Sequence, residues 1–224
     1  MYDTVDQKLD FPLVEIMPPN ILDRLRAGEV IIGDGSYNQT LEQRGYVLAN
    51  VWTPEASIEH PEAVRQLAME FARCGADITQ TYTFYSDDEK LKARLGPEGP
   101  TCFQINQSSS IIAKEISKMK STITAGGISK TDIYKSTRDR TKTVNELKTA
   151  LQVLIDNDID MIICEFFRNI EEMEWAIELA KSYGKPVAAT MAIGNDWKNS
   201  ARMDKSKQDQ TSMIKNGQAK KRIE

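Results

Sequence analysis

Short apolar runs rich in β-branched residues alternate along this chain with stretches of helical periodicity, and this alternation limits the fold more than any other feature. The apolar runs, each bounded by glycine, proline or polar residues, are Val30–Ile32, Ile78–Thr83, Thr122–Ala125, Met161–Cys164 and Val187–Met191. The segments with helical spacing are Pro61–Arg73, Ser109–Met119, Val144–Ile155 and Ile170–Ser182. A βαβα series of this kind predicts an α/β protein with about five parallel strands. Periodicity alone leaves two architectures open, a doubly wound sheet and an unfinished (β/α)8 barrel.

The ends of two predicted helices carry their own signals, and the last part of the chain differs from the rest. Pro61 suits the first turn of a helix, while Gly75 and Gly184 can take the left-handed conformation that ends one. We therefore expect an N-terminal extension over residues 1–20, an α/β domain over 21–194 and a polar tail over 195–224. Within that tail, residues 211–216 followed by Gly217 could form one short helix.

Composition and charge exclude several classes of protein. Of the 224 residues, 40% are hydrophobic, and the net charge of −4 comes from interspersed acids and bases, so no basic face for nucleic acid is expected. No apolar run is long enough to span a membrane. The cysteines Cys74, Cys102 and Cys164 are odd in number and far apart, which fits neither a disulfide framework nor a CxxC metal site. A reducing, cytoplasmic setting is expected.

Residues that follow the strands are the candidates for function, because ligands of parallel βα proteins bind at the carboxyl ends of the strands. After the first apolar run, Gly33-Asp34-Gly35 places a carboxylate between two glycines, where a ligand amine could approach the backbone. The other reading of this tripeptide is an ordinary turn. After the fourth run, Glu165 stands among apolar residues and needs a cationic partner, which could be a protein side chain or a ligand amine.

The segment Gln80-Thr81-Tyr82-Thr83-Phe84-Tyr85 alternates polar and aromatic residues, as the lining of a pocket with mixed chemistry would. Together with Trp52, its aromatic rings could surround a quaternary ammonium group, since each ring face attracts a cation by about 0.5–2 kcal/mol. The alternative is that Phe84 and Tyr85 belong to the core at a strand end. With a single histidine in the chain, Ser/His triads and histidine-based zinc sites are excluded.

Several motifs, taken together, resemble the betaine-using homocysteine S-methyltransferases in order and spacing from Ile21 to Gly194. They are Ile32-Gly33-Asp34-Gly35, Leu41-Glu42-Gln43-Arg44-Gly45-Tyr46, Trp52-Thr53-Pro54-Glu55-Ala56, Glu59-His60-Pro61-Glu62-Ala63-Val64-Arg65-Gln66-Leu67, the segment from Gln80 to Tyr85, Ala125-Gly126-Gly127-Ile128-Ser129, the segment around Glu165, and Lys185-Pro186-Val187-Ala188-Ala189-Thr190-Met191-Ala192-Ile193-Gly194. The resemblance implies an incomplete (β/α)8 TIM-type barrel and methyl transfer from betaine or a related donor to homocysteine, giving methionine.

The same resemblance assigns binding roles to eight residues and implies zinc for the full-length family. Asp34, Gly35, Thr81 and Glu165 would hold the amino acid part of homocysteine, and the aromatic residues Trp52, Phe84, Tyr85 and Phe166 would enclose the methyl donor. Family members hold zinc with three cysteines that follow the sixth and eighth strands, and zinc makes the homocysteine thiol a nucleophile. No cysteine here matches those positions, so we expect no metal ligand, no assignable catalytic residue and no zinc in this chain.

Two departures from the family pattern bear on the ligands. Phe166 stands where betaine-using members carry tyrosine, and Ser36 with Tyr37 replaces a small, apolar pattern. Two hypotheses therefore remain: a homocysteine methyltransferase whose zinc half lies elsewhere, or a non-catalytic truncated form that binds homocysteine or an ammonium compound weakly. In either case, unpaired strand edges could lead to self-association.

Overall fold

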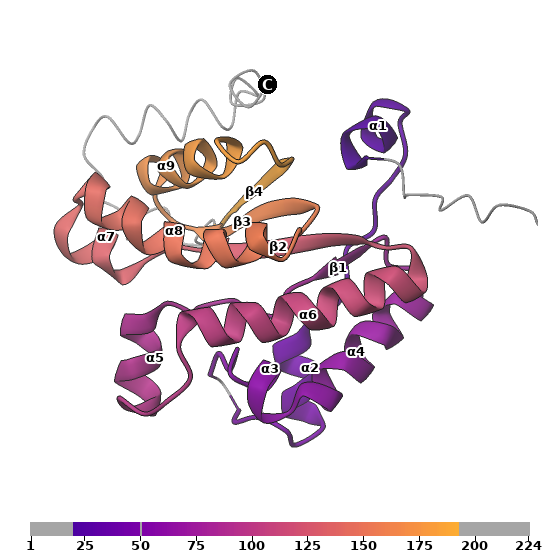
Figure 1. Ribbon diagram of the computed structural model, residues 1–224, viewed down its shortest axis with the longest axis horizontal. Helices are drawn as coiled ribbons and strands as arrows, with labels where there is room; N and C mark the ends of the chain where they lie inside the picture. The colour runs from indigo at the N-terminus through magenta and orange to yellow at the C-terminus, as the bar shows by residue number, and fades with distance from the viewer. Residues whose placement is uncertain (1–19, 50, 193–224) are drawn as a thin grey trace, which may run out of the picture. The chain divides into compact units, whose positions relative to one another are not determined.

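The computed structural model describes residues 20–49 and 51–192 (Figure 1). The predicted tail and its short helix lie outside the described residues, as does the N-terminal extension apart from Asn20. The elements are, in order, α1 (Ile21–Arg26), α2 (Tyr37–Gln43), α3 (Ala56–Glu59), α4 (Pro61–Arg73), β1 (Ile78–Gln80), α5 (Asp88–Leu95), α6 (Cys102–Lys120), β2 (Ile123–Ser129), α7 (Asp132–Thr137), α8 (Arg140–Asp156), β3 (Met161–Phe167), α9 (Ile170–Lys181) and β4 (Val187–Met191).

The order of the strands separates the two architectures that periodicity left open. All pairings are parallel, and the sheet order β1-β2-β3-β4 follows the sequence, so each strand pairs with the next one along the chain. A doubly wound sheet reverses its order at an inner strand. The unbroken order, with α4, α6, α8 and α9 packed along the strands in Figure 1, is that of a (β/α)8 barrel.

The two faces of the sheet bury different side chains. Toward the helices, Ile162, Cys164 and Phe167 of β3 pack against side chains of α8 and α9. On the opposite, inner face, Ile123 and Ala125 of β2 pack with other small and β-branched side chains from neighbouring strands and from α1. The apolar character of the strands on both faces is what a barrel interior and its helical coat require.

One of the five predicted strands is not formed. Residues Val30–Ile32 have no strand conformation, and the side chains of Val30 and Ile32 are 83% and 55% exposed. The segment lies beside β1, where the Ile32 carbonyl accepts hydrogen bonds from the backbone N–H groups of Asp77 and Ile78 (2.8 and 3.2 Å). An apolar run with β-branched residues predicted a buried strand, but the ladder that would bury it is absent from the described residues.

The helix predictions agree with the structure in the long segments. The helix predicted over Pro61–Arg73 has these bounds, with Pro61 in its first turn, and Gly75 and Gly184 take positive φ angles of 101° and 73° as expected. The other three predicted helices are present with shifted ends, α6 and α8 being longer than expected. The short helices α1, α2, α3, α5 and α7 were not predicted.

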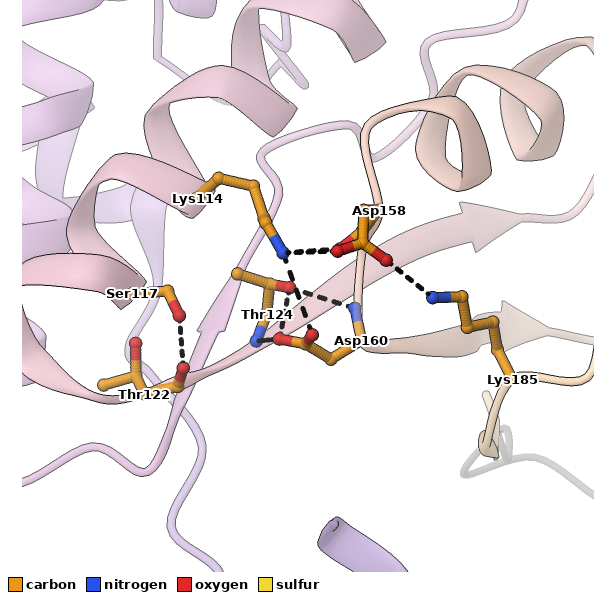
Figure 2. Close-up of polar contacts among 7 residues, drawn as sticks. All are labelled: Lys114, Ser117, Thr122, Thr124, Asp158, Asp160 and Lys185. Atoms are coloured by element: carbon orange, nitrogen blue, oxygen red, sulfur yellow. Dashed lines mark hydrogen bonds and ion pairs between the residues drawn. The ribbon is translucent and has the colours of Figure 1, made fainter. Parts of the chain in front are cut away.

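Aspartates that precede strands connect the amino ends of neighbouring strands. Asp160, just before β3, accepts hydrogen bonds through Oδ2 from the N–H and the hydroxyl of Thr124 on β2 (2.7 and 2.6 Å), and its own N–H donates to that hydroxyl (3.0 Å; Figure 2). Asp77, just before β1, accepts from the N–H of Ile32 in the same way (2.8 Å). Thr124 is fully buried, so these bonds satisfy polar groups that water does not reach.

A third aspartate, Asp158, extends this network across the amino-end face. Asp158 lies between two lysines: Lys114 of α6 donates to its carbonyl (2.6 Å), and Lys185, just before β4, donates to its carboxylate (3.1 Å; Figure 2). The hydrogen bond from Lys185 lowers the pKa of Asp158. Because Asp158 is 81% exposed, its ion pairs contribute little to stability.

Replacing Asp160 with alanine is expected to lower the free energy of unfolding by about 1–3 kcal/mol, because the Thr124 N–H and hydroxyl lose their charged acceptor inside the protein. Urea denaturation measures the change. Asp156→Ala is the control, since Asp156 is exposed and its carboxylate accepts only from the neighbouring Gln152 side chain (2.8 Å). Equal losses in the two variants would show that Asp160 does not connect the strands.

Candidate functional site

A cavity of about 320 Å³ lies at the carboxyl ends of β1, β3 and β4. Its lining consists of Asp34, Gly35, Ser36, Tyr37, Asn38, Trp52, Gln80, Thr81, Tyr82, Thr83, Phe84, Glu165, Phe166 and Thr190. Seven of the eight residues to which the sequence assigned a role are in this list. The eighth, Tyr85, lies outside the lining but packs against Phe84, with ring centroids 4.4 Å apart. The structure therefore brings together residues that are up to 132 positions apart in the sequence.

Two carboxylates share one end of the cavity and are connected through Gln80. The backbone N–H of Gln80 donates to Asp34 Oδ2 (2.8 Å), and the side-chain amide of the same residue donates to Glu165 Oε1 (3.0 Å). No described cation forms an ion pair with either acid. Of the two partners that the sequence left open for Glu165, a protein cation is therefore not found among the described residues, and a ligand amine stays a proposal.

The two acids hold their protons more strongly than free carboxyl groups do. Burial raises the pKa of Glu165 to about 7, the Gln80 hydrogen bond opposes this, and the nearby charge of Asp34 adds to it. Burial also raises the pKa of Asp34 to about 6, against the lowering effect of the Gln80 N–H. A cation that enters the cavity stabilises the ionised form of both carboxyl groups, because it compensates for the hydration that they lose on burial.

Gly127 on β2 leaves the space that Glu165 occupies. A Cβ atom at this position would lie 2.5 Å from Glu165 Oε1 and 3.0 Å from Gln80 Nε2. On the same strand, a Cβ at Gly126 would instead meet Leu154 of α8, on the helix-facing side. The two consecutive glycines therefore serve different faces of the sheet.

A β-bulge allows Glu165 and Phe166 to face the cavity together. The register of β3 against β4 shifts between Cys164 and Phe167, both of which are fully buried toward the helices. In the shifted stretch Phe166 has a φ of 58°, a left-handed conformation that is strained for a bulky side chain. Tyr85 is strained in the same way, with a φ of 62°. Strain of this kind gathers at functional sites, where the surrounding structure enforces it.

Aromatic rings form the other end of the site, with Phe84 at their centre. The Phe84 ring centroid lies 4.5 Å from that of Trp52, 4.4 Å from that of Tyr85 and 5.4 Å from that of Phe166, each pair edge to face. The Trp52 side chain is 47% exposed, more than a core residue would be. The alternative that Phe84 and Tyr85 are core residues does not fit, because both are only partly buried.

Three cations lie against these rings. The Nζ atoms of Lys90 and Lys130 lie 4.2 and 4.9 Å from the Tyr85 ring centroid, and the Arg168 guanidinium lies 5.3 Å from that of Phe166. Lys90 is also bound to the Lys130 carbonyl (3.0 Å) and to Asp87 (2.5 Å). Asp87 therefore compensates the charge of Lys90, which leaves Lys130 and Arg168 as the cations at the edge of the aromatic rings.

The sequence assigned no role to half of the lining residues, and it extended one strand too far. Gln80 and Tyr37 received no role, although the cavity includes both. The apolar run Ile78–Thr83 predicted a strand through Thr83, but β1 ends at Gln80 and the chain then turns. Tyr82 consequently lies mostly in the core, where it is 6% exposed and stacks on Tyr37, and it also borders the cavity.

The three cysteines do not fit a zinc site. Cys74 is exposed at the end of α4, whereas Cys102 and Cys164 are buried in different parts of the domain. Burial raises the pKa of both buried thiols to about 12, so neither supplies the thiolate that zinc requires. In residues 20–49 and 51–192, no three histidine, cysteine, aspartate or glutamate side chains come together as metal ligands.

Comparison with known proteins settles the family. A profile described as homocysteine S-methyltransferase matches residues 31–220. The chain belongs to the homocysteine S-methyltransferase family. It is 47% identical over 176 residues to betaine–homocysteine S-methyltransferase 1 of Danio rerio and 45% identical to that of Bos taurus. These matches cover 79% and 78% of this chain but 44% and 43% of the relatives, so the chain matches under half of each relative's length.

Solved structures of homocysteine methyltransferases share the fold. The metallated form of the homocysteine methyltransferase MmuM from Escherichia coli matches with a TM-score of 0.63 at 21% identity, covering 75% of this chain and 65% of that chain. Its oxidized form gives a TM-score of 0.64 at 20% identity, covering 78% and 65%. At this identity the similarity supports the barrel-type fold of the family and nothing finer. No helix of the described ranges is long and apolar enough to cross a membrane.

Proposed function

We propose that this chain binds homocysteine and a methylated ammonium donor side by side in the cavity, as the substrate-binding part of a betaine-using homocysteine S-methyltransferase. The observation that supports this most is the cavity itself, because one lining combines Asp34 and Glu165 at one end with Trp52, Phe84 and Phe166 at the other. Acids attract the α-ammonium of an amino acid, and ring faces attract a quaternary ammonium.

In this proposal the homocysteine end uses four residues. Asp34 and Glu165 accept from the α-ammonium group, and the buried Thr81 offers a hydroxyl. Gly35 contributes its backbone to the lining, and the Phe71 ring fills the space that a Cβ atom would need there. The Thr81 hydroxyl is paired with that of Thr83 (3.0 Å) and accepts from the Gly127 N–H (3.1 Å), which fixes its position. These contacts would orient the ligand so that its thiol points toward the aromatic end.

The donor end favours a zwitterion over a simple cation. Lys130 and Arg168 lie against the outer rings, so they would repel a ligand with only positive charge, whereas the charge of Lys90 is compensated by Asp87. A donor that carries its own carboxylate, as betaine does, compensates this repulsion. Phe166 cannot supply the hydroxyl that a tyrosine would offer to that carboxylate, and in this chain Arg168 would take that part.

Calorimetric titration of the chain with betaine and with tetramethylammonium tests the donor end. We expect betaine to bind more tightly, and we expect Phe84→Leu to weaken betaine by roughly three- to thirtyfold, because Phe84 contacts the three other rings of the site. Phe103→Leu is the matched control, since Phe103 is an exposed phenylalanine of α6 outside the cavity. Equal affinity of wild type and Phe84→Leu for betaine would contradict the assignment.

We further propose that the 224-residue chain binds these ligands without transferring the methyl group. Transfer needs the homocysteine thiol as a thiolate, and near neutral pH most of a free thiol is protonated. The three cysteines cannot hold the zinc that the family resemblance implies, since two are buried as thiols and the third is remote from them. This observation supports the second of the two hypotheses from the sequence, a non-catalytic protein of the family that binds these ligands.

Elemental analysis after dialysis and a methyl-transfer assay decide between binding alone and catalysis. We expect no stoichiometric zinc and no methionine formation from betaine and homocysteine above a control without protein. One tightly bound zinc per chain, with turnover that Asp34→Ala abolishes, would show that the chain catalyses methyl transfer.

The free thiols at all three cysteines support a reducing, cytoplasmic setting for the protein.

We also propose that the chain self-associates through the edges of its sheet. Within the described residues β4 pairs only with β3, and the segment beside β1 exposes Val30. Unpaired strand edges without charged side chains pair readily with other molecules. Val30→Lys is therefore expected to shift the sedimentation coefficient toward that of a monomer, whereas Leu48→Lys, at a 75% exposed position in a loop, is expected to change it little. A wild-type chain that sediments as a monomer and unfolds in one sharp step would refute the proposal.

A further inference from the structure

The cavity contains one buried hydroxyl that has no hydrogen-bond partner. Tyr37, the first residue of α2, is 7% exposed, and its hydroxyl is unpartnered among the described residues. A side-chain contact between this hydroxyl and Asp34 lowers the pKa of Asp34 and raises that of Tyr37, but the contact does not meet the distance and angle of a full hydrogen bond. A buried hydroxyl without a partner is costly, so such a group in a native protein calls for an explanation.

The Tyr37 ring cannot turn to find another partner. It stacks on Tyr82 at a centroid distance of 5.5 Å and packs edge to face on Phe71 at 5.3 Å. Tyr82 is itself fixed, because its hydroxyl donates to Asn38 Oδ1 (2.7 Å) and lies 3.1 Å from the hydroxyl of Thr53. Tyr37 therefore lines the cavity with its ring fixed and its buried hydroxyl held close to Asp34.

The neighbouring acid and this hydroxyl complement an α-amino acid. Asp34 Oδ2 already accepts from the Gln80 N–H, which leaves the other oxygen of the carboxylate for a ligand ammonium group. In an α-amino acid the carboxylate is attached to the same carbon as the ammonium, so it lies within a few ångströms of whatever binds the ammonium. Burial and the charge of Asp34 raise the pKa of Tyr37, so the phenol keeps its proton and can donate it.

We propose that the Tyr37 hydroxyl donates a hydrogen bond to the α-carboxylate of the amino acid ligand whose ammonium group pairs with Asp34. This inference rests on the proposed homocysteine binding and adds a specificity-determining residue to it. The site then distinguishes amino acids from plain amines, because an amine without a carboxylate leaves the buried hydroxyl unpaired. The departure from the small, apolar pattern that the sequence shows at Tyr37 thereby gains a function.

Titration of Tyr37→Phe with two ligands tests the inference. L-Homocysteine carries the carboxylate, and 3-aminopropane-1-thiol keeps the amine and the thiol but lacks it. We expect Tyr37→Phe to bind homocysteine roughly tenfold more weakly than wild type does, and the aminothiol with unchanged affinity. Tyr183→Phe is the control, since the Tyr183 hydroxyl donates to exposed Gln152 (3.2 Å) far from the cavity lining, and it should bind both ligands as wild type does.

Thermal unfolding without ligand gives a second readout. Tyr37→Phe should unfold at the same or a higher temperature than wild type, because it removes an unsatisfied hydroxyl, whereas Tyr82→Phe should unfold at a lower temperature, because its hydroxyl is bonded. Unchanged homocysteine affinity, or equal weakening of both ligands, would overturn the inference and leave the proposed function standing. A wild-type chain that binds neither ligand would overturn both.

Discussion

Homocysteine is expected to bind this chain roughly a hundredfold or more tightly at about pH 7.5 than at about pH 5, because both acids of the cavity must be ionised to pair with the ligand ammonium. The pKa of Glu165 is raised to about 7 and that of Asp34 to about 6, so both are largely neutral at the lower pH. Each acid that must lose its proton weakens binding tenfold for every pH unit below its pKa. Calorimetric titrations at half-unit intervals measure the profile.

The variant Glu165→Gln is the control for this profile, because it keeps the shape of the side chain and removes its titration. Its binding should be weak throughout, and it should vary only by the roughly tenfold that Asp34 alone contributes. A wild-type affinity that does not change between these pH values would show that the two acids do not hold the ligand.

The stability of the ligand-free chain should change with pH in the opposite direction. A carboxyl group whose folded pKa is raised holds more protons in the folded state than in the unfolded one between its ordinary pKa and the raised value. For Asp34 and Glu165 that window runs from their ordinary pKa values of 3.8 and 4.5 to about 6 and 7. Their contribution to the free energy of unfolding therefore falls as the pH rises through the window, while ligand affinity grows.

A single methyl group at Gly127 is expected to weaken homocysteine binding by roughly ten- to a hundredfold with only a small change in stability. The Cβ of Gly127→Ala would lie 2.5 Å from Glu165 Oε1, which is the far end of a flexible side chain and can move away. Movement of this carboxylate separates it from Gln80 and misplaces it for the ligand. Titration with homocysteine and thermal unfolding, measured on the same preparation, separate the loss of binding from any loss of fold.

Gly33→Ala is the matched control, because Gly33 directly precedes Asp34 and a Cβ there meets no atom within 4 Å. This variant should bind as wild type does. If Gly127→Ala kept full affinity, the Glu165 carboxylate would have no fixed place in the site, and the assigned role of Glu165 would be wrong.

The long elements of the fold followed from periodicity, and the short ones did not. A helix such as α4 carries several turns of spaced apolar residues and was located to the residue. The helices α2, α5 and α7 are too short for a periodic pattern, and their only signals are the capping residues Ser36, Asp87 and Thr131. The run Val30–Ile32 was predicted as a strand from its apolar composition, but it forms none. Composition does not show whether a neighbouring strand is available for pairing.

The candidate site was predictable where a residue type is unusual in its surroundings. A carboxylate in an apolar strand identified Glu165, and glycines around an acid identified Asp34. Gln80 and Tyr37 had no such signal, because their roles depend on atoms brought near by the fold, namely the two acids for Gln80 and the stacked rings for Tyr37. The bulge that turns Phe166 into the cavity likewise arises from the pairing of β3 with β4 and has no local sequence mark.

The most direct test of homocysteine binding is a calorimetric titration of the 224-residue chain with L-homocysteine at about pH 7.5 under reducing conditions, repeated with Glu165→Gln. We predict one molecule bound per chain and an affinity roughly a hundredfold lower in the variant, because the ammonium loses a charged acceptor in a partly buried site. No saturable binding to the wild-type chain, or equal affinities for the two proteins, would contradict the proposed function.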